Sequence, residues 1–351
     1  MREFFSHLLY NQIEMNIKRK FRLVLVAGLL VLLAACAPAA AGTPAAAASA
    51  APSLPPALPV ESSPTALPVT ASLPEAFTAT PTASPTPNPA IRFAVIGDFG
   101  MGDQAEADVA ALVHSWTPDF ILTVGDDNYP SGAADTIDAH IGQYYHDFIF
   151  PYTGTYGPGA AENRFFPTLG NHDWLTPGAK PYLAYFSMPG NGRYYDFKRG
   201  PVHFFALDSD ENDPDGVGSR TVQAAWLKQA LAASTSPWNI VYFHHAPYSS
   251  GTTHGSTNWM QWPFAAWGAQ AVLTGHEHNY ERLLVDGIPY FVNGLGGGPI
   301  YNDFASLLPE SQFHYSANYG AMLVTASPAQ VAFEFHDRTG KLVDQYKLQK
   351  P

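Results

Sequence analysis

The sequence IRFAVIGDFG, residues 91–100, points to the class of fold. Its apolar run ending in Gly-Asp is typical of a buried strand that enters a loop. Four later apolar runs also end directly before polar residues: Phe120–Gly125, Phe165–Leu169, Asn239–Phe243 and Ala271–Thr274. Ligands of such sheets bind at the carboxyl ends of the strands. We therefore expect these five ends to bring Asp, Asn, His and Tyr side chains to one edge.

Helical patterns alternate with the strands in the first part of the chain, and strands dominate later. Helices are predicted at 103–115, 135–147, 221–233 and 259–268. Further strand-like runs are Val202–Leu207, Ala321–Thr325 and Val331–His336. This order predicts a mixed α/β fold in which two sheets pack together with helices outside. We expect residues 91–351 to form a single catalytic domain with four layers, αββα.

The first 36 residues have the features of an export signal. Basic residues between Lys18 and Arg22 precede thirteen apolar residues, Leu23 to Ala35. This run is short for a membrane span, which takes about 20 residues. Its end, Leu33-Ala34-Ala35-Cys36, resembles the lipobox of bacterial lipoproteins. The resemblance implies cleavage before Cys36, lipid attachment there, and an exported protein tethered to a bacterial membrane, at the cell surface or in the periplasm. The alternative is an uncleaved N-terminal anchor.

Residues 37–90 are predicted to be a spacer. They contain thirteen prolines and only two charged residues, Glu61 and Glu75. Such a segment cannot bury enough apolar surface to fold, and its prolines favour extended polyproline II. We expect a semi-rigid, disordered linker that holds the domain away from the membrane.

Charge and cysteine usage exclude several classes of function. The formal net charge is −12, so the chain should repel nucleic acids, and we expect no nucleic-acid binding. Contact with a membrane is expected through the lipid anchor alone. Cys36 is the only cysteine, which excludes internal disulfides and Cys-based zinc or iron–sulfur sites. Any metal must bind His, Asp, Asn, Glu or Tyr.

Five short clusters at the strand ends carry the candidate chemistry. They are Gly97-Asp98-Phe99-Gly100, Gly125-Asp126-Asp127-Asn128-Tyr129, Gly170-Asn171-His172-Asp173, Val241-Tyr242-Phe243-His244-His245 and Gly275-His276-Glu277-His278. Each is a weak signal alone, because a Gly-Asp after a strand is usually only a turn. Their order and their shared placement argue against coincidence.

Together the clusters resemble the calcineurin-like metallophosphoesterases, over nearly all of residues 91–351. Their details resemble the purple acid phosphatase branch, and the length of the domain resembles its small, tartrate-resistant type. Tyr129 sits where that branch has an iron-binding tyrosinate, and Gly100 replaces the His of the Asp-x-His found in other branches. The run from Gly275 to Arg282 resembles the Gly-His-x-His-x-Tyr-Glu-Arg of larger plant members.

The resemblance implies a pair of metal ions bridged by Asp126. The first ion would also bind Asp98, Tyr129 and His278; the second would also bind Asn171, His244 and His276. A phenolate with two carboxylates favours Fe(III), whereas the second set suits Fe(II), Zn(II) or Mn(II). If the loop after Ala271–Thr274 is locally extended, His276 and His278 point the same way and can each serve one ion.

Two further histidines are candidates for catalysis. His172 matches the family's substrate-contacting His, and His254 resembles a second such His. The spacing from His244 to His254 differs slightly from that in the small enzymes of the family. His245 is an alternative ligand if the pattern is interpreted as His-x-Pro. We favour His244, because the run to Gly251 then aligns without a gap. Gly294–Gly298 lacks a nucleotide-binding pattern and is expected to form a tight loop near the site. Three tryptophans are expected in the core rather than in a substrate cleft: Trp259, Trp262 and Trp267.

The resemblance implies hydrolysis of small phosphate monoesters by a metal-bound hydroxide, as in acid phosphatases. Two metal ions can activate a water and clamp the attacking and leaving oxygens. One alternative is a phosphodiesterase or nucleotide hydrolase with the same centre. Another is a surface-binding protein on an inactive phosphatase fold, which should have lost ligands, and the sequence retains all seven.

Overall fold

The computed structural model describes residues 90–302, 304 and 306–350. Cys36, the predicted signal and residues 37–89 of the predicted spacer lie outside the described residues. Within the described part of the chain, no helix has the length and apolar character needed to cross a membrane.

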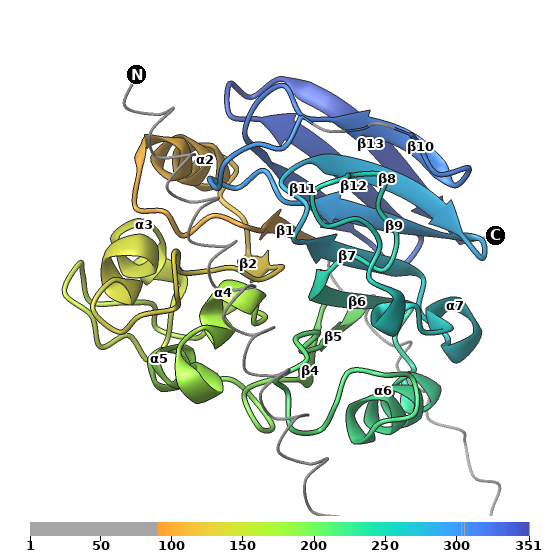
Figure 1. Ribbon diagram of the computed structural model, residues 1–351, viewed down its shortest axis with the longest axis horizontal. Helices are drawn as coiled ribbons and strands as arrows, with labels where there is room; N and C mark the ends of the chain where they lie inside the picture. The colour runs from red at the N-terminus through yellow and green to blue at the C-terminus, as the bar shows by residue number, and fades with distance from the viewer. Residues whose placement is uncertain (1–89, 303, 305, 351) are drawn as a thin grey trace, which may run out of the picture. The chain divides into compact units, whose positions relative to one another are not determined.

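The first sheet joins the two ends of the described chain. Its order is β13-β12-β11-β1-β2-β3. The strands are β1 Ile91–Ile96, β2 Phe120–Thr123, β3 Phe165–Phe166, β11 Gly320–Ala326, β12 Gln330–Asp337 and β13 Leu342–Gln349. The central strand β1 runs parallel to β2 and antiparallel to β11, with Ile91 opposite Ala326. In Figure 1 the orange β1 accordingly lies between the blue C-terminal strand β11 and its early neighbour β2.

The second sheet has seven strands in the order β10-β8-β9-β7-β6-β5-β4. They are β4 Tyr195–Arg199, β5 Val202–Ala206, β6 Trp238–His245, β7 Ala271–Gly275, β8 Tyr280–Val285, β9 Ile288–Asn293 and β10 Ser311–Tyr315. The row β5-β6-β7-β9 is parallel, and β4, β8 and β10 are antiparallel additions. The carboxyl ends of the four parallel strands therefore share one edge.

The two sheets enclose the main hydrophobic core. Phe93 and Val95 of β1 point into it, whereas Ala94 and Ile96 point into the helix layer, and all four are fully buried. Burial on both faces explains the apolar run of β1 from Phe93 to Ile96, whereas Arg92 near its start is exposed.

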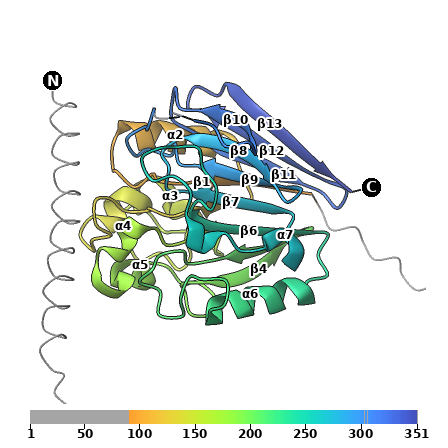
Figure 2. The same ribbon diagram turned by 45° about the vertical axis from the view of Figure 1, so that its right-hand side comes forward.

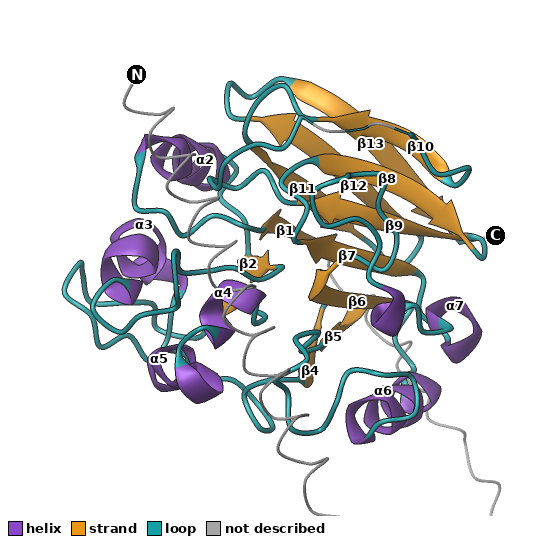
Figure 3. Cartoon of the chain, in the orientation of Figure 1, coloured by secondary structure: helices purple, strands orange, loops and turns teal. Residues whose placement is uncertain are grey.

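Helices cover the outer face of each sheet (Figures 2 and 3). The first sheet is covered by α2 Gln104–Ser115, α3 Gln143–Tyr145, α4 Asn171–Trp174 and α5 Lys180–Tyr185. The second is covered by α6 Val222–Ala233 and α7 Phe264–Trp267. The predicted mixed α/β architecture with four layers is confirmed.

Several predicted elements differ in detail. The helix predicted at 135–147 is a π-helical turn, η1 Asp138–Gly142, followed by α3 and the 3₁₀ turn η2 His146–Phe148. The helix predicted at 259–268 is a 3₁₀ turn, η4 Asn258–Met260, and the separate α7, which begins after Pro263. Pro263 has no N–H with which to continue the first turn. The structure adds β4, α5 and the 3₁₀ turn η3 Pro177–Ala179, which the sequence patterns do not predict.

Candidate metal centre

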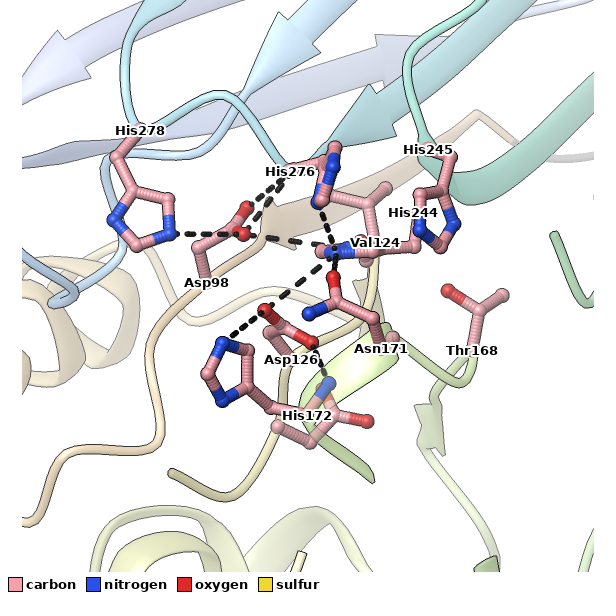
Figure 4. Close-up of polar contacts among 12 residues, drawn as sticks. Asp98, Val124, Asp126, Thr168, Asn171, His172, His244, His245, His276 and His278 are labelled. Atoms are coloured by element: carbon pink, nitrogen blue, oxygen red, sulfur yellow. Dashed lines mark hydrogen bonds and ion pairs between the residues drawn. The ribbon is translucent and has the colours of Figure 1, made fainter. Parts of the chain in front are cut away.

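Donor side chains from both sheets meet where the strands end (Figure 4). The first sheet supplies Asp98 after β1, Asp126 and Tyr129 after β2, and Asn171 after β3. The second supplies His244 near the end of β6, and His276 and His278 after β7. The structure therefore brings together all seven residues that the resemblance assigns to metals.

The backbone at three of these residues takes an unusual conformation. Asp98, Asp126 and His276 have φ angles of 55°, 53° and 73°, in the left-handed region that costs energy for residues with a side chain. Crowding also explains the glycine before Asp126 and the glycine before His276. A Cβ on Gly125 would come within 2.7 Å of the His244 ring, and one on Gly275 within 2.4 Å of Asp98 Oδ2. The Gly-Asp and Gly-His pairs are therefore required by close packing around the site.

The phenol of Tyr129 lies at the centre of the oxygen donors. Its Oη is 3.0 Å from Asp126 Oδ2, 2.9 Å from His278 Nε2 and 3.5 Å from Asp98 Oδ1. The side chain is buried, with 1% of its surface exposed. A phenol, two carboxylates and an imidazole are thus in mutual contact away from water.

The imidazole of His244 lies at the centre of the other donors. Its Nε2 is 3.0 Å from Asn171 Oδ1, 3.1 Å from His276 Nδ1 and 3.5 Å from Asp126 Oδ2. Its Nδ1 is 2.9 Å from the carbonyl oxygen of Val124, which can only accept a hydrogen bond. The proton therefore belongs on Nδ1, which leaves the Nε2 lone pair for a metal.

His278 is oriented in the same way. Its Nδ1 is 2.7 Å from the carbonyl oxygen of Pro299, so its Nε2 faces Asp98 Oδ1 at 3.4 Å. The local backbone is not extended as predicted, since His276 is left-handed and residues 276–279 form bends. The two rings nevertheless reach different neighbours, His276 beside His244 and His278 beside Tyr129.

The charges in the cluster favour a cation. Burial opposes ionisation of Asp126, but the neighbouring His244 and His172 lower its pKa to about 2. Burial likewise opposes the charge on His244 and His278, yet the nearby carboxylates raise the pKa of both. Burial and neighbouring imidazoles hold the pKa of His276 well below its ordinary value. The carboxylate of Asp126 is therefore ionised and His276 neutral, the forms that bind metals.

The donor set fits a metal ion. Ligand atoms of Asp98, Asp126 and His244 lie within 4.8 Å of one another, and so do those of His244, His245 and His276. The first group is rich in carboxylate and the second in imidazole, and His244 belongs to both. These are oxygen and nitrogen donors of the kind that first-row transition metals bind.

The structure separates the two histidines at the end of β6. His244 is fully buried against Asn171 and Asp126, whereas the Nδ1 of His245 is 2.9 Å from Ser209 Oγ. The His245 ring also lies 4.4 Å from the His276 ring, between centroids. His244 is thus the member of the pair beside the carboxylates.

His172 and His254 lie at the edge of the cluster. The backbone N–H of His172 donates to Asp126 Oδ1 at 2.8 Å, and its Nε2 is 3.9 Å from Asp126 Oδ2. The half-buried His254 ring stacks on the His276 ring, with 4.0 Å between centroids. Both candidates for catalysis therefore lie beside the proposed metal ligands.

The predicted glycine-rich loop and one tryptophan also border the site. The N–H of Gly298 donates to Asp98 O at 2.7 Å, which places the loop where it was expected. Trp262 is buried and Trp267 packs against the same core, as predicted. Trp259 differs: 39% of its surface is exposed, and its ring lies 5.9 Å from the His245 ring.

Three residues near the cluster were not singled out from the sequence. The carboxylate of Asp173 accepts the N–H groups of Gly170 and Asp127, and burial together with Asp126 raises its pKa to about 7. Its position within the Gly-Asn-His-Asp cluster was an available signal. Tyr301 stacks on His278 at 4.3 Å, and Glu277 accepts the N–H of His254. No local pattern marks Tyr301, because the preceding glycine-rich loop brings it to the site.

Comparison with known proteins agrees with this geometry. The calcineurin-like phosphoesterase family model matches residues 91–280. Human tartrate-resistant acid phosphatase type 5 is 27% identical over 59% of this chain and 73% of its own length. Purple acid phosphatase 15 of Arabidopsis thaliana is 30% identical, over 54% of this chain and 40% of its own. These relatives are acid phosphatases, which are hydrolases acting on phosphoric esters.

Solved structures show the same fold at lower identity. A purple acid phosphatase from yellow lupin has a TM-score of 0.60 at 18% identity, covering 76% of this chain and 55% of that one. GAP50, the anchor in the inner membrane complex of Plasmodium, has a TM-score of 0.58 at 19% identity, covering 74% and 89%. The chain therefore belongs to the calcineurin-like phosphoesterase family, with purple and tartrate-resistant acid phosphatases among its relatives.

Proposed function

We propose that this chain is a metal-dependent phosphatase that hydrolyses small phosphate monoesters. The observation that carries the proposal is the convergence of seven donor side chains from five strand ends on one buried point. An inactive binding protein has no use for a buried cluster of charged and polar groups, which costs folding free energy unless paired. The acid phosphatases among the relatives support the same reaction class.

The proposed centre would hold two ions, and Asp126 would contribute to both sites. Asp126 Oδ2 lies 3.0 Å from Tyr129 Oη on one side and 3.5 Å from His244 Nε2 on the other. Asp98, Tyr129 and His278 would complete a site for Fe(III), and Asn171, His244 and His276 a site for Fe(II), Zn(II) or Mn(II). When bound, the pair would supply charge neutralisation and activation of water.

His172 and His254 would act on the substrate. The Nδ1 of His172 lies 2.7 Å from the carbonyl oxygen of Pro130, so this nitrogen carries a proton. Its Nε2 is then the atom that can bind a phosphoryl oxygen or carry a proton to the leaving group. His254, stacked on His276, would offer a second imidazole beside the same point.

A pair of substrates tests the proposal. We expect purified, metal-loaded protein to hydrolyse p-nitrophenyl phosphate faster than bis(p-nitrophenyl) phosphate, and to lose activity on removal of its metals. A faster diester reaction would favour a phosphodiesterase or nucleotide hydrolase. Hydrolysis of neither, over a range of pH and with two metals bound, would favour a surface-binding protein.

We also propose that the protein is an exported lipoprotein. The proposal rests on the basic residues between Lys18 and Arg22, the apolar run that follows them, and its end at Leu33-Ala34-Ala35-Cys36. Two or more acyl chains would anchor it stably, whereas one chain binds a membrane only marginally. We expect membrane fractionation, release by protease cutting within residues 37–90, and a mature terminus at a lipidated Cys36 in mass spectrometry. Cys36→Ser should give an unlipidated form. An unmodified terminus elsewhere would contradict this part of the proposal alone.

A further inference from the structure

The segment that carries His276 and His278 also carries two buried carboxylates that the proposed chemistry does not use. Glu277 lies between the two histidines in the sequence, and Glu281 follows on β8. Both side chains are fully buried. A buried carboxylate is costly unless hydrogen bonds compensate for the lost water, so the donors around each one indicate what it holds.

Glu277 holds the loop that carries His254. Its Oε1 accepts the backbone N–H groups of His254 at 2.6 Å and Gly255 at 2.5 Å. The carboxylate also lies against the bare Cα of Gly251, where a Cβ would come within 2.5 Å of Glu277 Cδ. The loop 249–256 is therefore folded around this side chain.

Glu281 holds the beginning of the same loop. Its two oxygens accept the backbone N–H of Ser250 at 2.7 Å and the Ser250 hydroxyl at 2.6 Å. Near the ends of the loop, the N–H of Ser249 donates to Ser256 Oγ at 3.0 Å. The chain thus offers two equally buried carboxylates on one segment, of which only Glu277 contacts the backbone of His254.

These contacts fix His254 relative to the proposed metal ligands. The His254 ring stacks on the His276 ring with 4.0 Å between centroids and 29° between planes. Glu277 directly follows His276 in the chain, so the anchor of His254 moves with the residue on which its ring is stacked.

We propose that Glu277 is a positioning residue for His254, holding its imidazole at the edge of the metal centre. The inference rests on the proposed function, in which His254 acts on the substrate. A displacement of about 1 Å in a catalytic group can cost about 10²-fold in rate, so loss of the anchor should be visible in turnover.

A double-mutant cycle in the metal-loaded full chain tests this role. We expect Glu277→Ala and His254→Ala each to lower kcat by about 10²–10⁴-fold. The double variant should be only slightly less active than the less active of the two single variants, because both changes remove the same imidazole from its place. Glu277→Gln retains a carbonyl oxygen as acceptor and should recover most of the turnover. Multiplicative losses in the double variant, or full activity in Glu277→Ala, would overturn the proposal.

The control is Glu281→Ala, which removes an equally buried carboxylate from the same segment. We expect it to lower the unfolding temperature while keeping kcat within about tenfold of the parent, because the Glu277 anchor remains. Metal content should be unchanged in both glutamate variants. Loss of metal in Glu277→Ala would show that the residue supports His276 and His278 instead, and would contradict the positioning role.

Hydrogen exchange tests the anchor without any assay of activity. The amides of His254 and Gly255 should exchange faster in Glu277→Ala than in the parent or in Glu281→Ala. Unchanged exchange would overturn the inference. A parent protein that binds two metals and hydrolyses no phosphate ester would instead refute the proposed function, and the exchange data would still decide whether Glu277 holds the loop.

Discussion

The two sheets bring different chemistry to the same point. The six-stranded sheet supplies the oxygen donors Asp98, Asp126, Tyr129 and Asn171, and the seven-stranded sheet supplies the three imidazoles. All of the carboxylate and phenol donors of the cluster therefore follow strands of one sheet. Neither sheet alone carries the candidate metal centre, because the hard oxygen donors come from one sheet and the softer imidazole donors from the other.

The two donor sets are also positioned by different means. On the oxygen side, Asp98 and Asp126 depend on left-handed backbone directly after a strand. On the imidazole side, His244 and His278 depend on hydrogen bonds to carbonyl oxygens that fix the ring orientation. Substitutions on the two sides should therefore impair metal binding and catalysis in different ways.

Asp126→Asn should have the largest effect, because this carboxylate touches donors of both sheets. We expect kcat/KM to fall by about 10⁴-fold or more, as when one member of a catalytic unit is removed. Metal analysis should show fewer than two ions per chain. Asp127→Asn is the matched control, because burial raises the pKa of Asp127 and the neutral amide resembles its protonated form. Two tightly held metals in Asp126→Asn would contradict the bridging role.

His172→Ala should separate catalysis from metal binding on the oxygen side. Its ring lies at the edge of the cluster, so metal content should stay at two ions while kcat falls by about 10²–10⁴-fold. The exposed His314 offers a control substitution that should leave both values unchanged. Equal activity of His172→Ala and the parent at every pH would remove His172 from the mechanism.

His244→Ala and His245→Ala should differ on the imidazole side. His244 contacts Asn171, His276 and Asp126, so its loss should release the second ion and most of the activity. His245 is bonded to Ser209, so His245→Ala should retain both metals and lose about tenfold or less in turnover. Metal loss in the second variant alone would reverse the ligand assignment.

Tyr129→Phe should have a smaller effect on the rate and a large effect on the spectrum. A phenolate bound to Fe(III) gives a visible charge-transfer band, and the phenylalanine ring fills the same buried space without the donor. We expect the colour to disappear while the unfolding temperature of the metal-loaded protein changes little. A colourless parent after expression with ample iron would contradict the tyrosinate assignment.

Metal binding should release protons in acid solution. Neighbouring carboxylates raise the pKa of His244 and His278 against the effect of burial. Both imidazoles are therefore protonated on both nitrogens, and positively charged, in the metal-free chain at pH 6. A metal needs the neutral rings, so affinity should fall as the pH falls. Titration in weak buffer should show up to about two more protons released at pH 6 than at pH 9. Equal release at both values would contradict the raised pKa values.

The sequence predicts the architecture and the donor cluster because the motifs follow buried strands. Each Gly-Asp or Gly-His pair can be recognised locally because it directly follows a strand, although the crowding around Gly125 and Gly275 comes from His244 and Asp98, which are distant in sequence. The strands β1, β2, β6 and β7 were found for the same reason, since their apolar runs are buried on both faces. For these elements the local pattern and the tertiary fold agree.

Other features depend on contacts that a local pattern does not contain. The edge strand β4 is polar and partly exposed, so its sequence lacks the apolar run of a buried strand. The break before α3 adjoins Gly142, where a Cβ would meet the side chains of Asp138, Tyr152 and Tyr185. The roles of Glu277 and Tyr301 arise from loops distant in sequence. Tertiary packing decides these cases, and a single sequence does not display it.

The pairing of Ile91 with Ala326 constrains the timing of assembly during synthesis. The ribosome makes β1 long before β11, its antiparallel neighbour in the sheet. Contacts between residues so distant in sequence form slowly, because closing a long loop costs conformational entropy before the strand pairing can contribute favourable free energy. The first sheet therefore stays incomplete while the nascent chain elongates. A truncated product that ends before β11 would contain every donor residue and still lack three of the six strands of the sheet that positions the oxygen donors, so we expect such partial chains to be inactive.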